Sequence, residues 1–244
     1  MFKTIILFIS FAVYSFGISA EDIIKKVEDN MNGKSADITM AMEVHTKISK
    51  RTVRLQSLSV GKEKSFIKIL YPKKDYGITF LKLDNTMWQY VPRIERIIKI
   101  PASMMLQSWM GSDFTNDDLV KESSISDDYR QTLLKENDKL YKVELIPKEE
   151  AAVVWGKVVM DVSKEYYLPL TVEYYDEEGI LSRVLYYKDI KRFQNRFYPS
   201  YWELVPVTED KKGHKTLITI EDAVFDKDIS SSYFSKRALK RYSR

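Results

Sequence analysis

The sequence predicts a mainly β protein, in which many short strands form a curved antiparallel sheet accompanied by a few short helices. Three observations support this fold class. Apolar and polar residues alternate along most of the chain, which is the pattern of half-buried strands. Turn residues separate these segments about every ten residues, as in an antiparallel meander. Finally, 44% of the 244 residues are hydrophobic and 13% are aromatic, which suffices for a hydrophobic core.

The composition excludes several classes of chemistry. Without cysteine, the chain has no disulfide, no cysteine-ligated metal and no thiol nucleophile. Its two histidines, His45 and His214, leave little for a metal site or a catalytic triad. The formal net charge of +4 is small for this length and predicts no nucleic-acid partner. Because the serine-nucleophile, zinc-protease, phosphate-loop and dinucleotide motifs are absent too, we expect neither a cofactor nor an enzymatic activity.

Residues 1–20 have the features of a secretory signal peptide. Lys3 supplies a positive start, Ile5–Ile18 is apolar apart from two serines, and acidic residues follow Ala20. An uncleaved membrane anchor is the alternative, but the apolar run is shorter than the roughly 20 residues that span a bilayer. We therefore expect cleavage after Ala20, which leaves residues 21–244 as a single domain.

The first elements after the signal peptide are a helix and a strand. Glu21–Asn32 has apolar residues at helical spacing, and Gly33 is suited to end the helix. The period then drops to two, which predicts a half-buried strand. Its apolar face is formed by Ile38, Met40, Met42, Val44 and Ile48.

The remaining strands follow in the same style. In Arg51–Val60 the apolar positions change parity near Gln56-Ser57, which predicts a β-bulge that bends the sheet. Asp84-Asn85 is expected to form a hairpin turn. The other expected strands are Phe66–Tyr71, Gly77–Leu83, Thr86–Val91, Tyr129–Lys135, Lys139–Pro147, Val153–Val162, Leu170–Tyr175, Ile180–Ile190, Ser200–Thr208 and Thr216–Val224.

One segment, Pro101–Leu119, interrupts this rhythm and is called the lid segment below. It is rich in methionine and tryptophan, and Thr115 with Asp118 resembles a capping pair that opens a second short helix. Two interpretations are open. The segment either covers a cavity or plugs the sheet as an ordinary core. Its apolar side chains include Met104, Met105, Trp109 and Met110.

Several polar residues invite a functional interpretation that the sequence does not favour. Ser112 follows a glycine, but no histidine lies in a matching motif, so turn chemistry is the better explanation. Asp113, Asp117 and Asp118 lack the spacing of a calcium loop and are better explained by the start of a helix.

Basic residues gather in two places. Arg93, Arg96 and Lys99 lie after one strand, and five more lie at the C-terminus. They either meet anionic headgroups or a partner, or simply solvate sheet edges. Arg96 is the exception, because it is the lone charge on the parity of Trp88 and Tyr90, and a charge on an apolar face must be paired or serve a ligand. The alternative is that Pro92 resets the register, in which case Arg96 leaves this face. The C-terminal cations are Lys236, Arg237, Lys240, Arg241 and Arg244.

Motifs in the middle of the chain resemble a known family. Met87–Pro92 has the sequence MWQYVP, and Trp109–Leu119 contains WMGSDF followed by DDL. Leu168–Gly179 and Phe234–Leu239 fit as well. Together they resemble the outer-membrane lipoprotein-sorting protein family, in the branch of the LolA-like superfamily found beside RND-type exporters. The resemblance covers essentially all of the chain after the signal peptide.

This resemblance implies a fold and a function. The fold is a highly curved antiparallel sheet, an incomplete β-barrel, covered by a helical lid. The function is that of a soluble periplasmic carrier that binds acyl chains of lipoproteins or lipids and shuttles them towards the outer membrane. Such a carrier is expected to be a monomer with only transient membrane contact and an inner-membrane RND-type or ABC transporter as partner. The alternative is a non-enzymatic accessory or sensor module that binds a partner within an RND-type export complex.

The residues expected to line such a cavity are mostly methionines and aromatic residues. Methionine is flexible and polarisable, so it adapts to variable acyl chains. Arg96 is included as an analogue of the cavity arginine in LolA. The candidates are Met40, Met42, Trp88, Tyr90, Arg96, Met104, Met105, Trp109, Met110 and Phe114.

The absence of cysteine also bears on how the protein acts. A lipoprotein needs a cysteine after its signal peptide to carry its own acyl anchor, and this chain has none. The sequence therefore favours a mobile carrier rather than a receptor that is fixed to the outer membrane.

Overall fold

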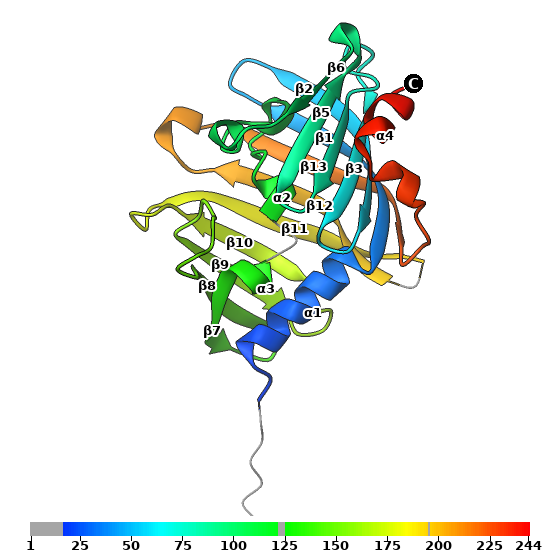
Figure 1. Ribbon diagram of the computed structural model, residues 1–244. Coiled ribbons are helices and arrows are strands. Elements are labelled where there is room, and N and C mark those ends of the chain that lie inside the picture. Colours follow the sequence, from blue (N-terminus) through cyan, green and yellow to red (C-terminus); the bar gives the residue numbers. More distant parts are fainter. Residues whose placement is uncertain (1–16, 122–124, 195) are drawn as a thin grey trace, which may run out of the picture.

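The computed structural model describes residues 17–121, 125–194 and 196–244, so most of the expected signal peptide lies outside the described residues. Within this part, thirteen strands form one antiparallel sheet in the order β6-β5-β4-β3-β2-β1-β13-β12-β11-β10-β9-β8-β7 (Figure 1). The first and last strands pair in the middle, and the sheet stays unclosed between its edges β6 and β7. The predicted fold class, a curved mainly β sheet with short helices, is confirmed.

The strands are β1 (Ser35–His45), β2 (Lys50–Val60), β3 (Lys64–Tyr71), β4 (Thr79–Leu83), β5 (Thr86–Val91), β6 (Arg96–Lys99), β7 (Tyr129–Glu136), β8 (Leu140–Pro147), β9 (Lys157–Ser163), β10 (Pro169–Tyr175), β11 (Leu181–Phe193), β12 (Arg196–Pro206) and β13 (Lys215–Phe225). The α-helices are α1 (Ala20–Asn32), α2 (Asp118–Lys121), α3 (Ile125–Asp128) and α4 (Lys236–Arg241). In the described ranges, no helix is long and apolar enough to cross a membrane.

Helix α1 confirms the first expected element. Its N-cap is Ser19, whose hydroxyl accepts a hydrogen bond of 3.1 Å from the Asp22 amide, and Gly33 ends the helix with a φ of 60°. The buried stripe Ile23, Ile24 and Val27 packs on the inner side of the sheet, where α1 meets β7, β12 and α3. Cleavage after Ala20 would remove the Ser19 cap, a change that typically costs about 1 kcal/mol of helix stability.

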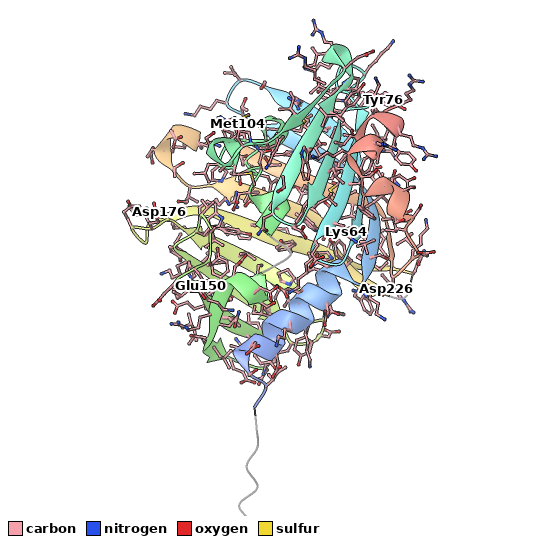
Figure 2. The ribbon with its side chains drawn as sticks, in the orientation of Figure 1. Lys64, Tyr76, Met104, Glu150, Asp176 and Asp226 are labelled. Atoms are coloured by element: carbon pink, nitrogen blue, oxygen red, sulfur yellow. The ribbon has the colours of Figure 1, made fainter. Side chains whose placement is uncertain are left out.

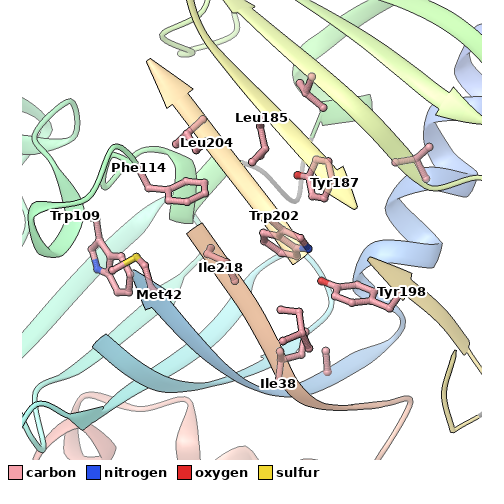
Figure 3. Packing of buried hydrophobic residues seen from close by; sticks show 14 of the residues in the cluster. Ile38, Met42, Trp109, Phe114, Leu185, Tyr187, Tyr198, Trp202, Leu204 and Ile218 are labelled. Carbon is pink, nitrogen blue, oxygen red and sulfur yellow. The ribbon is translucent and has the colours of Figure 1, made fainter. Parts of the chain in front are cut away.

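The sheet has a hydrophobic core on its inner side, where apolar side chains pack between the sheet and the helices (Figures 2 and 3). A second, smaller cluster lies on the outer face of β2 to β5, under the C-terminal segment. Both faces of these strands are covered, so apolar residues of either parity are buried. Val53 and Leu55 point into the inner core, whereas Leu58 points into the outer cluster.

The predicted bulge at Gln56-Ser57 is wrong, and the cover on both faces of β2 explains the pattern that suggested it. The pairing of β2 with β1 runs through Gln56 and Ser57 without a break, so the parity change reflects a change of buried face. The register shifts lie elsewhere, between Thr39 and Met40 towards β13 and between Arg54 and Leu55 towards β3.

The C-terminal segment docks on the outer face through helix α4, an element that the sequence had not predicted. Leu239 is fully buried there, and its carbonyl accepts a hydrogen bond of 2.7 Å from the Thr79 hydroxyl. The Ser243 hydroxyl donates to the Gly77 carbonyl at 2.7 Å. The basic tail is therefore part of the fold as well as a source of surface charge.

Gly77 makes this docking possible, which gives a first prediction. It has a φ of 79°, and a Cβ there would lie 2.3 Å from the Ser243 carbonyl oxygen. Gly179 is a matched control, with a φ of 78° and no atom within 4 Å of its virtual Cβ. Gly179→Ala should cost roughly 1–2 kcal/mol of unfolding free energy through backbone strain alone. Gly77→Ala should cost clearly more in urea titrations, because Ser243 must move too. Equal losses would contradict this role.

The lid segment consists of short turns on the inner side of the sheet. Two 3-10 turns, Ala102–Met104 and Trp109–Gly111, precede helix α2. The predicted capping pair is confirmed, because the Thr115 amide donates to Asp118 Oδ2 at 2.7 Å and the Asp118 amide donates to Thr115 Oγ1 at 3.2 Å.

Candidate functional site

A cavity of about 210 Å³ lies between the inner face of the sheet and the helices. Helix α1 contributes Val27 and Met31, and the lid segment contributes Trp109 and Phe114. The sheet supplies most of the remaining wall, and Figure 3 shows part of it. These wall residues include Ile38, Met40, Met42, Leu55, Ile67, Met160, Tyr187, Tyr198, Trp202 and Ile218.

Four of the ten predicted residues line this cavity: Met40, Met42, Trp109 and Phe114. Met42 is almost fully buried, whereas Met40 is half-buried, so its side chain has room to change conformation when a ligand enters. The Trp109 ring packs on Phe80, with 5.5 Å between the ring centroids.

Met104, Met105 and Met110 are half-buried and pack against the inner core from the lid segment, but they are not among the residues that line the cavity. The two interpretations of the lid segment are thus both partly right. The segment fills core volume with its methionines, and it also contributes Trp109 and Phe114 to a wall of the cavity.

Trp88 and Tyr90 do not line the cavity, so these predictions are wrong. Strand β5 points both rings at the outer face, where they join the cluster under α4, while Met87 points inward. The Lys236 ammonium lies 4.8 Å from the centroid of the Trp88 ring. The prediction failed because it assumed a single covered face.

Arg96 does not line the cavity either. The chain reverses after Val91 through a 3-10 turn and Glu95, which has a φ of 51°. Strand β6 then pairs antiparallel with β5, with Arg96 opposite Val91, and all four of its residues are exposed. Arg96 therefore does not share a face with Trp88 and Tyr90.

A buried ion pair fastens the lid segment to the sheet. Arg183 of β11 binds Asp118 of α2 through both terminal nitrogens, and the Nη1–Oδ2 distance is 2.8 Å. The same guanidinium lies 4.4 Å from the ring centroids of Trp155 and Tyr174. Paired carboxylate and stacked rings are what a buried guanidinium requires.

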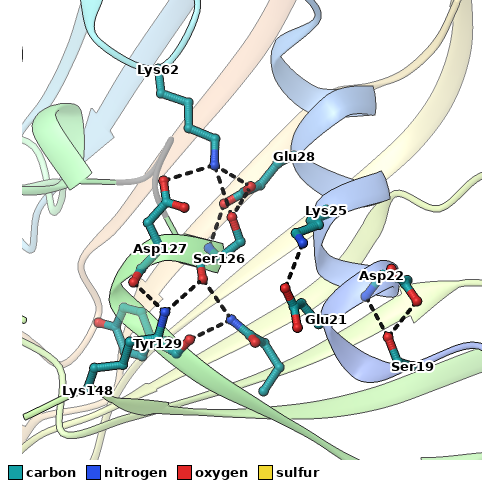
Figure 4. A network of polar contacts seen from close by, with 11 residues as sticks. Ser19, Glu21, Asp22, Lys25, Glu28, Lys62, Ser126, Asp127, Tyr129 and Lys148 are labelled. Atoms are coloured by element: carbon teal, nitrogen blue, oxygen red, sulfur yellow. Dashed lines mark hydrogen bonds and ion pairs between the residues drawn. The ribbon is translucent and has the colours of Figure 1, made fainter.

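A second polar network fastens helix α1 near the cavity (Figure 4). The buried Glu28 accepts from the Ser126 amide at 2.7 Å and from the Ser126 hydroxyl at 2.6 Å. Lys62, in the turn between β2 and β3, binds Glu28 at 2.8 Å and Asp127 at 3.2 Å. Burial opposes the charge on Lys62, but the hydrogen bonds and charges of Glu28 and Asp127 outweigh it and raise the pKa of Lys62. Lys62 therefore stays charged at neutral pH.

The aspartates considered as calcium ligands serve contacts within the protein. Asp113 accepts a hydrogen bond of 2.8 Å from the Thr216 hydroxyl, and Asp118 binds Arg183. Ser112 donates to the Trp109 carbonyl at 2.7 Å, as expected for turn chemistry. In the part of the chain that the structure describes, no three acidic or histidine side chains cluster as a metal site would require.

Comparisons with known proteins place this fold. The chain resembles a DUF1329 family protein from Desulfovibrio piger (TM-score 0.81, 21% identity, 90% of this chain and 97% of the other). It also resembles a domain described as outer membrane lipoprotein-sorting from Vibrio parahaemolyticus (TM-score 0.77, 24%, 91% and 98%). A third similar structure is a LolA superfamily protein from Nitrosomonas europaea (TM-score 0.76, 20%, 91% and 99%). None of the curated proteins matches this chain.

The sequence itself matches one family model, that of an uncharacterized protein family, over residues 61–241. This match spans β3 to α4, so it includes the lid segment and the buried ion pair of Asp118 and Arg183. The chain therefore belongs to this uncharacterized protein family, and its fold is that of the LolA superfamily.

Proposed function

We propose that this protein is a non-enzymatic periplasmic carrier that binds acyl chains of lipids or lipoproteins in the inner cavity and delivers them towards the outer membrane. The observation that carries the proposal is the apolar cavity between the curved sheet and the lid segment. Burial of each acyl CH₂ is worth roughly 0.8 kcal/mol, so a chain can bind tightly without catalytic groups.

The lining suits a cargo of variable shape. Met31, Met40, Met42 and Met160 lie in the wall, and their flexible side chains can repack around different chains. The volume of about 210 Å³ is below the ~300–1,000 Å³ of typical small-molecule pockets. We infer that loading widens the cavity by moving the lid segment away from the sheet.

The carrier proposal is tested by extraction and by refilling. The protein is purified from the periplasm, extracted with organic solvent and analysed by mass spectrometry for lipid. The stripped protein is then titrated with a dansyl-labelled fatty acid, whose fluorescence rises in an apolar site. A chain that carries no lipid and binds no probe would refute the proposal.

A cavity-filling variant sharpens this test. Met40→Trp should weaken binding of the dansyl probe at least tenfold, because the indole occupies the wall position of a half-buried methionine. Its stability should fall by no more than the roughly 1–3 kcal/mol of moderate overpacking. Leu106→Trp adds the same indole to an exposed position of the lid segment and should bind the probe normally. Equal affinities for both variants would place the probe elsewhere.

One observation favours the alternative of an accessory module. Strand β6 exposes Ile97 and Ile98 beside Arg96 and Lys99, and Ile94 is exposed in the preceding turn. An apolar and basic sheet edge of this kind suits a partner protein, for which an inner-membrane RND-type or ABC transporter is the candidate. Crosslinking from this edge that traps one partner, together with empty lipid extracts, would favour the module over the carrier.

A further inference from the structure

We propose that the β5–β6 hairpin and helix α4 together dock the protein on a bilayer surface that is rich in anionic lipids. Residues 92–99 and 236–244 form this surface and are called the docking tip. The inference deepens the proposed function, because it names the surface through which a carrier would meet a membrane. Its part in cargo delivery rests on the proposed function, whereas the docking itself rests on exposure, register and charge.

The hairpin exposes three isoleucines at and beside its turn. Ile94 in the turn is 53% exposed, and Ile97 and Ile98 of β6 are 42% and 39% exposed. Strand β6 is an edge of the sheet, where it pairs with β5. Large aliphatic side chains gathered on a sheet edge are unfavourable in water and mark a surface that something apolar covers.

The isoleucines lie on both faces of the hairpin, which favours a bilayer over a protein surface. Ile97 pairs with Tyr90, whose ring joins the outer cluster, and Ile98 pairs with Gln89. Directly paired residues share a face and successive residues alternate, so Ile97 and Ile98 point in opposite directions. A protein laid against one face would leave the other isoleucine in water, whereas lipid surrounds the hairpin and covers both.

The docking tip is also strongly basic. It contains eight lysines and arginines but one acidic residue, Glu95, so its side chains carry a net charge of +7. Since the whole chain carries only +4, the rest of the chain sums to −3. This asymmetry would turn the docking tip towards an anionic surface and hold it there. The cations are all exposed and comprise Arg93, Arg96, Lys99, Lys236, Arg237, Lys240, Arg241 and Arg244.

Helix α4 brings the second group of cations to the hairpin. It packs beside β4, β5 and β6, and Figure 1 shows it next to these strands. The Lys240 ammonium lies 3.8 Å from the Glu95 carboxylate, so the end of α4 reaches the hairpin turn. This contact offsets the one charge that an anionic surface would repel. Long basic side chains can keep their charge at the lipid phosphates while apolar neighbours enter the acyl region.

Vesicle flotation with the full mature chain tests the proposal. Wild-type protein should bind vesicles of phosphatidylcholine mixed with phosphatidylglycerol at least tenfold more tightly than vesicles of phosphatidylcholine alone. Arg93→Gln combined with Arg96→Gln should weaken binding to the mixed vesicles at least tenfold, because each basic residue near an anionic surface contributes about fivefold. Ile97→Asp and Ile98→Asp should each weaken it too, because lipid covers both faces of the hairpin.

The opposite edge of the sheet offers matched controls. Strand β7 exposes Leu134, Arg130 and Lys135. Leu134→Asp, and Arg130→Gln combined with Lys135→Gln, make the same chemical changes outside the docking tip and should bind the mixed vesicles as wild type does. All of these side chains are exposed, and thermal unfolding checks that each variant is folded.

The outcomes separate docking from cargo binding. A wild-type protein that binds neither kind of vesicle, or both equally, would overturn the docking surface. Normal binding by either Ile97→Asp or Ile98→Asp would overturn it as well and favour a protein partner on one face. The dansyl fatty acid is titrated into the same proteins. Uptake of this probe without docking would leave the carrier proposal standing, whereas docking by a protein that takes up no probe and carries no lipid would refute the carrier alone.

Discussion

Removal of one partner of the Arg183–Asp118 pair should destabilise the protein by roughly 3–5 kcal/mol, because the remaining charge stays buried without its counter-ion. Both side chains are at most 10% exposed. Asp118→Asn keeps an oxygen that can accept from the Thr115 amide, so its loss reports on the charge pair rather than on the helix cap. Arg183→Met removes the charge from the other side. Urea unfolding monitored by tryptophan fluorescence measures both changes.

Two comparisons make this prediction specific. Glu21→Gln breaks the exposed Lys25–Glu21 pair at 2.6 Å and should change stability by less than about 1 kcal/mol. The double variant of Asp118 and Arg183 should lose less than the sum of the single losses, since it leaves no unpaired charge. Losses below about 1 kcal/mol in both single variants would mean that the pair is solvated and does not fasten the lid segment.

The strands could be predicted because they depend on local alternation and turn residues. Thr86–Val91 was predicted with its observed boundaries, and most other strands were placed within a few residues. Val153–Val162 was started four residues early, because β9 begins only at Lys157. Alternation identifies residues that can be half-buried, but it does not say where pairing with the neighbouring strand begins.

What covers each face could not be predicted, because it depends on contacts distant in sequence. The outer cluster brings Leu58, Phe66 and Leu81 under Leu239, more than 150 residues away in the chain. Without knowledge of that cover, Trp88 and Tyr90 of β5 were assigned to the cavity on the inner face. Trp88 and Tyr90 were misplaced for this reason alone.

The charged residues show how a correct rule was applied to the wrong position. A lone charge on an apolar parity was noted at Arg96, where the chain turns and the parity is not continuous. Arg183 satisfies the same rule with Leu185 two residues later in β11, and the structure buries it. Lys82 satisfies it too, two residues after Phe80. The signal was present in the sequence, but only the strand boundaries show where it applies.

The two polar networks suggest how a carrier of this design would open. Arg183–Asp118 holds the lid segment to β11, and Glu28–Lys62 holds α1 to the turn between β2 and β3. Both networks border the cavity, because Asp118, Glu28 and Lys62 are among its lining residues. Weakening of either one therefore loosens a wall of the cavity without a change in its apolar interior.

Covalent closure of the lid segment should abolish loading of an acyl probe. The Asp113 amide donates to Thr216 Oγ1 at 3.0 Å, so these two residues join the lid segment directly to β13. The chain has no cysteine, so Asp113→Cys with Thr216→Cys introduces the only thiols. We expect the oxidised variant to take up the dansyl fatty acid at least a hundredfold more slowly than its reduced form, because the lid segment can no longer move.

The double variant serves as its own control. Reduction with dithiothreitol breaks the disulfide, so the lid segment can again open and close without a change of sequence. The single variants Asp113→Cys and Thr216→Cys should show no response to oxidation. Mass spectrometry after thiol alkylation establishes that the bond has formed. If the oxidised double variant loads as fast as the reduced one, then acyl chains enter by a route that does not require the lid segment to leave β13. The mobile wall would then have to be helix α1, which the Glu28–Lys62 network holds.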